Sequence, residues 1–285
     1  MRSDGMLSAR ANLRIPSSMF IRAFRGWKAM TKSWLRPAIP LVAIAIVLVV
    51  GPKFLPHGRG FTFLGVLVLL AAEFAVIGWA INDRPIGAFI DNRNRLSLSK
   101  LQAGAWTAVV LAGLATAAAY NALVPGTNYS SLTALNVVIP GELLLAMGIS
   151  ATSLVATPSL LSLKASETPL ASSVTTAQAK LPGSSNNGKL TTRSSAADAS
   201  WSDLVTGDEV GNAGSPDLGK IQQALITLLL LGCYTGYVYE MFVHTSGPIG
   251  TLPVIDKSFV WLMGISHASY LAYKAAPHTQ TESPS

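Results

Sequence analysis

The chain has 285 residues, of which 50% are hydrophobic and only 12% are charged. Soluble globular proteins carry about 25% charged residues, so this composition excludes an ordinary soluble domain and favours a membrane protein. In such a chain the net charge of +7 more often reports loop topology than nucleic-acid binding, and we expect no nucleic-acid partner. The single cysteine, Cys233, excludes an intrachain disulfide or a cysteine-based zinc site.

Residues 1–36 hold eight Lys or Arg and one acid, and we interpret them as a basic cytoplasmic arm. Part of this arm, 20–30, mixes basic and bulky apolar residues. It suits an amphipathic helix on an anionic membrane surface as well as a disordered arm. Residues 37–81 predict the first two transmembrane helices. The run 37–51 is short for a span of about 20 residues, whereas 61–81 has full length.

The next part of the chain repeats one pattern. Ser97-Leu-Ser-Lys-Leu-Gln102 opens an apolar run, and Asp217-Leu-Gly-Lys-Ile-Gln222 opens another one 120 residues later. Each run is followed by a second apolar run that contains Met-Gly-Ile-Ser, at 147–150 and at 263–266. The pattern predicts a duplicated two-helix unit whose two copies lie parallel in the membrane.

The repeated residues suit the start of a helix at the membrane boundary. The first residue of each copy is a good N-cap, and the lysine three residues later can reach anionic lipid head groups. The glutamine either contacts the other copy or is hydrated at the interface. The three equivalent pairs are Ser97 and Asp217, Lys100 and Lys220, and Gln102 and Gln222.

The helix pairs, 97–156 and 217–276, flank a polar segment, 157–216, that we expect to be a largely disordered cytoplasmic loop. Ser, Thr, Asn and Gly dominate it, above all in 164–198, so it can bury little apolar surface. A polar tail, 277–285, closes the chain. The sequence thus predicts an all-α polytopic membrane protein with about six transmembrane helices.

Charge counts predict the orientation of these helices. The N-terminal arm, the connector 82–100, the segment 157–220 and the C-terminal end together hold 18 of the 21 Lys and Arg residues. Because Lys and Arg concentrate in cytoplasmic segments, we expect both termini and the 157–216 loop in the cytoplasm. The lipid bilayer surrounds the helices, and we expect a bacterial inner membrane.

Three polar residues within or near the spans are candidate functional groups. Glu73 lies near the middle of its span, where a carboxylate is costly unless it is paired, protonated or hydrated. It belongs either to a cation or proton pathway or to a structural contact inside the bundle. Glu142 lies near the external boundary, and His267 is either a proton relay or a packed histidine. The acids near 203–217 do not match a calcium loop, so no metal and no cofactor is expected.

Small residues in the Met-Gly-Ile-Ser helices predict close helix packing. Gly148, and Gly264 with Ala268, have the spacing of a helix-packing seam. The neighbouring Ser266 and His267 do not indicate a serine hydrolase, because adjacent helical residues point about 100° apart. We therefore expect a protein that is not an enzyme.

Two motifs resemble those of an uncharacterised group of bacterial multi-pass inner-membrane proteins. They are Arg95-Leu-Ser-Leu-Ser-Lys-Leu-Gln102, with Trp106 behind it, and Gly264-Ile-Ser-His-Ala-Ser-Tyr270. The resemblance covers about 83–156 and 200–277. It implies a multi-pass membrane fold and no particular activity.

Two functions follow as hypotheses from these features. The first is a self-associating membrane anchor or scaffold, whose basic arm and 157–220 segment recruit a cytoplasmic partner. The alternative is an ion or proton channel, or a permease-like element, that uses Glu73. An intramembrane hydrolase is a remote third reading.

Overall fold

The computed structural model describes residues 17–124 and 134–281, with side chains from residue 36 onward. Most of these residues are helical. Two short strands and three 3-10 turns lie between α4 and α6, and a fourth 3-10 turn precedes α3. The helices are α1 Ser17–Phe54, α2 Arg59–Asn82, α3 Leu98–Leu123, α4 Gly141–Ala165, α5 Ala171–Lys180, α6 Leu218–His244 and α7 Lys257–Ala275. The strands are β1 Ser184–Asn187 and β2 Leu190–Arg193, and the turns are η1 Gly87–Phe89, η2 Ala196–Asp198, η3 Trp201–Leu204 and η4 Val210–Asn212.

Five helices are long and apolar enough to cross a membrane: α1 from Arg36 onward, α2, α3, α4 and α6. Helix α7, with 19 residues, is not among them. The structure therefore agrees with the predicted all-α membrane class, while the sixth span and the duplication stay predictions.

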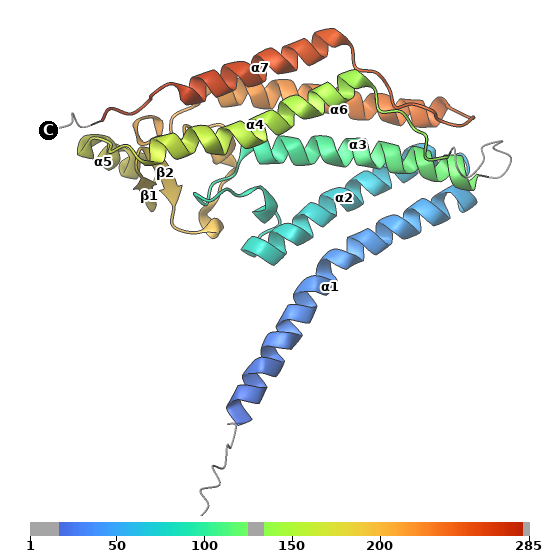
Figure 1. The fold of residues 1–285 in the computed structure, drawn as a ribbon, viewed down its shortest axis with the longest axis horizontal. Coiled ribbons are helices and arrows are strands. Elements are labelled where there is room, and N and C mark those ends of the chain that lie inside the picture. Colours follow the sequence, from blue (N-terminus) through green and yellow to red (C-terminus); the bar gives the residue numbers. More distant parts are fainter. Residues whose placement is uncertain (1–16, 125–133, 282–285) are drawn as a thin grey trace, which may run out of the picture.

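The helices α3, α4, α6 and α7 lie side by side and form the main bundle (Figure 1). Helix α2 packs against α3 and α6. The C-terminal part of α1 packs against α2, and the N-terminal part of α1 points away from the bundle (Figure 1). Large side chains from several helices fill the centre, where burial of apolar surface stabilises the packing by about 25 cal/mol per Å². The largest of these buried apolar side chains are Phe63, Trp106, Tyr120, Leu143, Phe242, Leu252 and Met263.

Extended segments precede α4 and α7 and lie against each other. The Val138 amide donates to the Gly250 carbonyl at 2.8 Å, and the Leu252 amide donates to the Val138 carbonyl at 3.0 Å. The side-chain amide of Asn121 adds bonds to both backbone groups of Ile249, at 2.7 and 2.8 Å. These bonds satisfy backbone groups that no helix satisfies, and they fix where α4 and α7 begin.

The segment 157–216, expected to be largely disordered, is folded, so that expectation is wrong. Helix α4 continues to Ala165, and α5, the β1–β2 hairpin and the 3-10 turns follow it. Backbone hydrogen bonds tie β2 to the rest of the protein: the Thr191 amide donates to Asp208 and the Arg193 amide to Arg93, both at 2.9 Å. The low hydrophobicity of the segment predicts disorder, but hydrogen bonds and ion pairs stabilise its fold in place of buried apolar surface. We call residues 83–97, 166–217 and 276–281 the cap.

Candidate functional site

A buried ion cluster joins the cap to the bundle, and Asp208 lies at its centre. Its carboxylate is 2.5 Å from Lys274 Nζ, 2.9 Å from Arg93 Nη2 and 3.0 Å from Lys220 Nζ. Arg95 Nη1 lies 3.7 Å away. The cations come from α6, α7 and the loop before α3, so one carboxylate connects three parts of the chain.

The charges around Asp208 decide its ionisation. Burial by itself would raise the pKa of this carboxyl group, but the positive charges of Lys220, Lys274, Arg93 and Arg95 lower the pKa well below its usual value. The Asp208 carboxylate is therefore ionised at every pH near neutrality. A buried carboxylate with this many cations is a clamp, because removing it would leave those cations without their partner.

A second buried ion pair, between Lys164 of α4 and Glu209, completes the junction. Lys164 Nζ also donates to the backbone carbonyls of Lys274 and Ala276, both at 2.6 Å. The Glu209 carboxylate accepts a hydrogen bond from the His278 amide at 3.0 Å. The sequence predicts a solvated acidic face here, opposite Arg93, Arg95 and Lys100. The structure places Arg93 and Arg95 beside Asp208, but Asp208 and Glu209 are buried.

The first residue of each repeated motif caps its helix. The Ser97 hydroxyl accepts a hydrogen bond from the Lys100 amide at 3.4 Å, and the Asp217 carboxylate accepts one from the Lys220 amide at 3.0 Å. Both residues have an extended backbone, as N-caps do.

The two repeated lysines bind the cap instead of lipid head groups, contrary to the prediction. Lys100 Nζ donates to the Ile90 carbonyl at 2.7 Å, and Lys220 Nζ donates to the Thr206 carbonyl at 2.7 Å. Because the cap is folded over these helix ends, backbone carbonyls replace the expected phosphates as partners.

Gln102 of the first repeated motif contacts the helix of the second copy, but through Gln223, the residue after the motif, and not through Gln222. Gln102 Oε1 accepts a hydrogen bond from Gln223 Nε2 at 2.8 Å, and Gln102 Nε2 donates to Thr227 Oγ1 at 3.0 Å. Gln222 is exposed. The neighbouring residue faces inward because Lys220, Gln223 and Thr227 follow helical spacing on one face of α6.

His267 lies inside this polar interior, between α4, α6 and α7. The hydroxyl of Ser153 on α4 is 2.6 Å from His267 Nδ1, and Gln223 Nε2 is 3.2 Å from the same nitrogen. All three side chains are buried. Sequence reasoning had weighed Ser266 as the partner of His267 and missed Ser153, because the signal is a contact between separate helices.

The neighbourhood of His267 holds further polar groups without partners. Ser150 Oγ, Ser266 Oγ and Gln223 Oε1 are buried and have no hydrogen-bond partner among the described residues. An unpaired buried polar group costs about 1–3 kcal/mol, so this concentration calls for a physical explanation.

The predicted helix-packing residues do not all pack. Gly148 is exposed, and no atom lies within 4 Å of the position of an added Cβ; the packing prediction is wrong there. Ala268 is exposed as well. Gly264 is half-buried, and its Cβ position lies 3.6 Å from Ile149. The seam between α4 and α7 uses larger side chains and the Ser153–His267 contact.

The two candidate glutamates lie apart from this interior. Glu73 is half-buried in α2, and its Oε2 is a buried atom without a hydrogen-bond partner among the described residues. Glu142 is half-buried in the first turn of α4, where the helix dipole stabilises a negative charge. Within 17–124 and 134–281, no group of three His, Cys, Asp or Glu is arranged to hold a metal ion.

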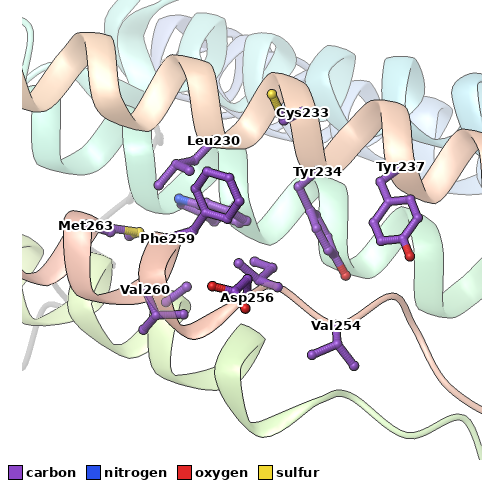
Figure 2. Close-up of a pocket in the computed structure, with 12 residues that line it drawn as sticks. Leu230, Cys233, Tyr234, Tyr237, Val254, Asp256, Phe259, Val260 and Met263 are labelled. Carbon is purple, nitrogen blue, oxygen red and sulfur yellow. The ribbon is translucent and has the colours of Figure 1, made fainter.

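A cavity of about 350 Å³ lies between α6 and α7 (Figure 2). Its walls are mostly apolar or aromatic, and exposed residues of both helices lie at its edge. This volume is in the range of small-ligand pockets, about 300–1,000 Å³. The lining residues are Trp106, Ala146, Leu230, Cys233, Tyr234, Tyr237, Val254, Ile255, Asp256, Phe259, Val260 and Met263.

The fold and its long apolar helices define a polytopic helical membrane protein. Comparisons with protein-family models, with curated proteins and with solved structures find no match to the chain. The resemblance to the bacterial inner-membrane group therefore stays a prediction.

Proposed function

We propose that the protein is a membrane anchor or scaffold that presents a rigid cap to a cytoplasmic partner in a bacterial inner membrane. The observation that carries this proposal is the buried ion cluster. It connects the cap to α4, α6 and α7 through Lys164, Lys220 and Lys274. A cap held at several points keeps one orientation to the bilayer, which is what a docking platform needs.

The anchor presents two kinds of surface to its partner. One is the basic arm, 1–36, with eight Lys or Arg. The other is the outer face of the cap, where polar residues of α5 and of the β1–β2 turn, such as Gln178 and Asn187, are exposed. Positive charge on the arm accelerates association with an acidic partner, and the cap supplies the fixed contact surface.

Site-specific photo-crosslinking in cells tests this function. A benzophenone amino acid at Asn187 should give one discrete protein adduct, and deletion of 1–36 should reduce its yield. The matched control is Leu228, an exposed residue of the membrane-spanning part of α6, which should give no adduct with a cytoplasmic protein. The proposal fails if neither Asn187 nor Gln178 yields an adduct.

Self-association is part of this proposal and uses α6. Gly232 and Gly236 are exposed four residues apart, and no atom lies within 4 Å of either Cβ position. Such a pair lets a second helix approach closely in a bilayer. A second copy of the chain would pack its own α6 across these glycines.

An ion or proton pathway through Glu73 is the second candidate function. The buried, unpaired Oε2 of Glu73 favours it, since a carboxyl group inside a span often marks such a path. In proteoliposomes, Glu73→Gln should then abolish ion or proton flux, with Glu142→Gln as the control. Equal flux for the wild type, for Glu73→Gln and for empty vesicles rejects this candidate.

A further inference from the structure

We propose that Ser153 and His267 form a nucleophile–base pair that hydrolyses lipid-soluble carboxylic esters entering from the bilayer. Ser153 Oγ lies 2.6 Å from His267 Nδ1, across the contact between α4 and α7. A serine hydroxyl within hydrogen-bond reach of an imidazole is the arrangement that acyl transfer requires. This site is independent of the anchoring function and can fail without affecting it.

Gln223 holds the imidazole in the form that acts as a base. Its Nε2 lies 3.2 Å from His267 Nδ1 and 3.4 Å from His267 Nε2, and an amide N–H can only donate. An N–H group that faces both ring nitrogens favours the neutral imidazole, whose Nδ1 lone pair can accept the proton of Ser153 at 2.6 Å. Gln102 Oε1 accepts from Gln223 Nε2 at 2.8 Å, so Gln223 and Gln102 are positioning residues.

Two unpaired hydroxyl groups provide donors for the negative charge that develops during acyl transfer. Ser150 Oγ and Ser266 Oγ are buried without partners among the described residues. Ser150 lies one turn before Ser153 on α4, and Ser266 adjoins His267 on α7. Donors fixed in a water-poor site stabilise an oxyanion strongly, and the bound oxyanion would supply the partner that both hydroxyls lack.

The cavity between α6 and α7 brings an apolar substrate close to this pair. Ala146 and Met263 line it, and each lies one turn before a residue of the site, Ser150 or His267. A separation of four residues corresponds to about 6 Å along the helix axis. The close-up shows Met263 on the α7 side of the cavity (Figure 2). Met263 is fully buried, and its flexible side chain is the barrier that must change rotamer to admit a substrate.

The substrate class follows from the lining of the cavity and from where it opens. Cys233 and Tyr237 line the cavity and are exposed on α6, a helix long and apolar enough to cross the membrane. Asp256 is the one charged residue of a lining that is otherwise mostly apolar and aromatic, so the cavity accepts a hydrocarbon chain and disfavours anionic groups. An ester of a fatty acid meets both conditions and also carries the carbonyl carbon that a serine attacks.

The chemical step balances with water as the only co-reactant. Ser153 Oγ bonds to the ester carbonyl carbon while its proton passes to His267 Nδ1. The bond from that carbon to the alcohol oxygen breaks, and His267 returns the proton to the leaving alkoxide. Water then attacks the acyl-serine with His267 as base, which releases the fatty acid and restores Ser153.

The test uses an alkyl fluorophosphonate on the full-length protein in detergent, with the adduct mapped by peptide mass spectrometry. We expect a single phosphonyl adduct on Ser153, formed with loss of fluoride and absent from Ser153→Ala. His267→Asn should slow labelling at least tenfold, and Met263→Ala should accelerate it. Hydrolysis of p-nitrophenyl esters of medium-chain fatty acids should follow the same order.

The control is Ser269→Ala, which removes an exposed serine of α7 and should change neither labelling nor hydrolysis. Wild-type protein that elutes as a folded species but carries no adduct on Ser153 overturns the proposal. Labelling of Ser153 at an unchanged rate in folded His267→Asn also overturns it. If that variant does not fold, Ala146→Phe, which narrows the cavity, must slow labelling of Ser153.

Discussion

At the scale of single residues, Asp208 is the group on which the cap depends most. Replacing it by Asn leaves Lys220, Lys274 and Arg93 buried without their shared carboxylate. Breaking a buried ion pair from one side costs about 3–5 kcal/mol. We expect Asp208→Asn to lower the detergent melting temperature strongly, whereas Asp198→Asn, in an exposed turn, should change it little. A melting temperature for Asp208→Asn within a degree or two of wild type would contradict the clamp.

The same residue predicts how stability depends on pH. The pKa of Asp208 is depressed in the folded protein, so its contribution is fully present above the unfolded-state value of about 3.9. It is lost as the pH falls from there toward the lower folded-state pKa. The stability difference between wild type and Asp208→Asn should therefore shrink below about pH 4. Thermal melts of both proteins across this range measure it.

Residue patterns could predict Ser97 and Asp217 as candidate caps, since an N-cap depends on its own helix. They could not predict the lysine partners of Asp208 or the serine partner of His267. Those partners lie 66 residues away for Lys274 and 114 for Ser153, and a single sequence contains no signal for such contacts. The shift from Gln222 to Gln223 has the same origin, because helix rotation is set by packing against neighbours.

At the scale of elements, the β1–β2 hairpin and α5 hold the cap together. Excision of 170–195 removes the β2 bonds to Asp208 and Arg93 and the pairing of Arg193 with Asp203. We expect this deletion to reduce the yield of monodisperse protein several-fold in fluorescence-detected gel filtration. Asn187→Ala, at the exposed turn, serves as the control. Unchanged yield after the deletion would show that the cap is dispensable for folding.

The exposed glycines of α6 make a second prediction at this scale. Cys233, the only cysteine of the chain, is exposed next to Gly232, so mild oxidation in membranes should give a disulfide-linked dimer. Gly232→Leu with Gly236→Leu should reduce its yield several-fold, because larger side chains separate the helices. Gly148→Leu, at an open glycine on α4, is the matched control. Equal reduction by all three changes would argue against an α6 interface.

At the scale of the whole molecule, the charge distribution predicts one orientation. Most described Lys and Arg residues belong to the cap or the helix ends beneath it, whereas Arg59 and Lys257 lie at or near the starts of α2 and α7. Reporter fusions at Gly247 should therefore be external and those at Asn187 cytoplasmic. A cytoplasmic signal from Gly247 would reject the orientation. The charge pattern of the sequence also predicts an external position for Ser131, which lies outside the described residues.

The ion cluster also sets an order of events during synthesis. Asp208 leaves the ribosome before Lys220 and long before Lys274. Glu209 likewise leaves before His278, whose amide donates a hydrogen bond to the Glu209 carboxylate. The junction can close only when α7 has been made, so until then the chain exposes charged groups to the quality-control proteases of the cell. A chain released before Lys274 never closes its cap and would be removed. The junction therefore forms only after α7 has been translated.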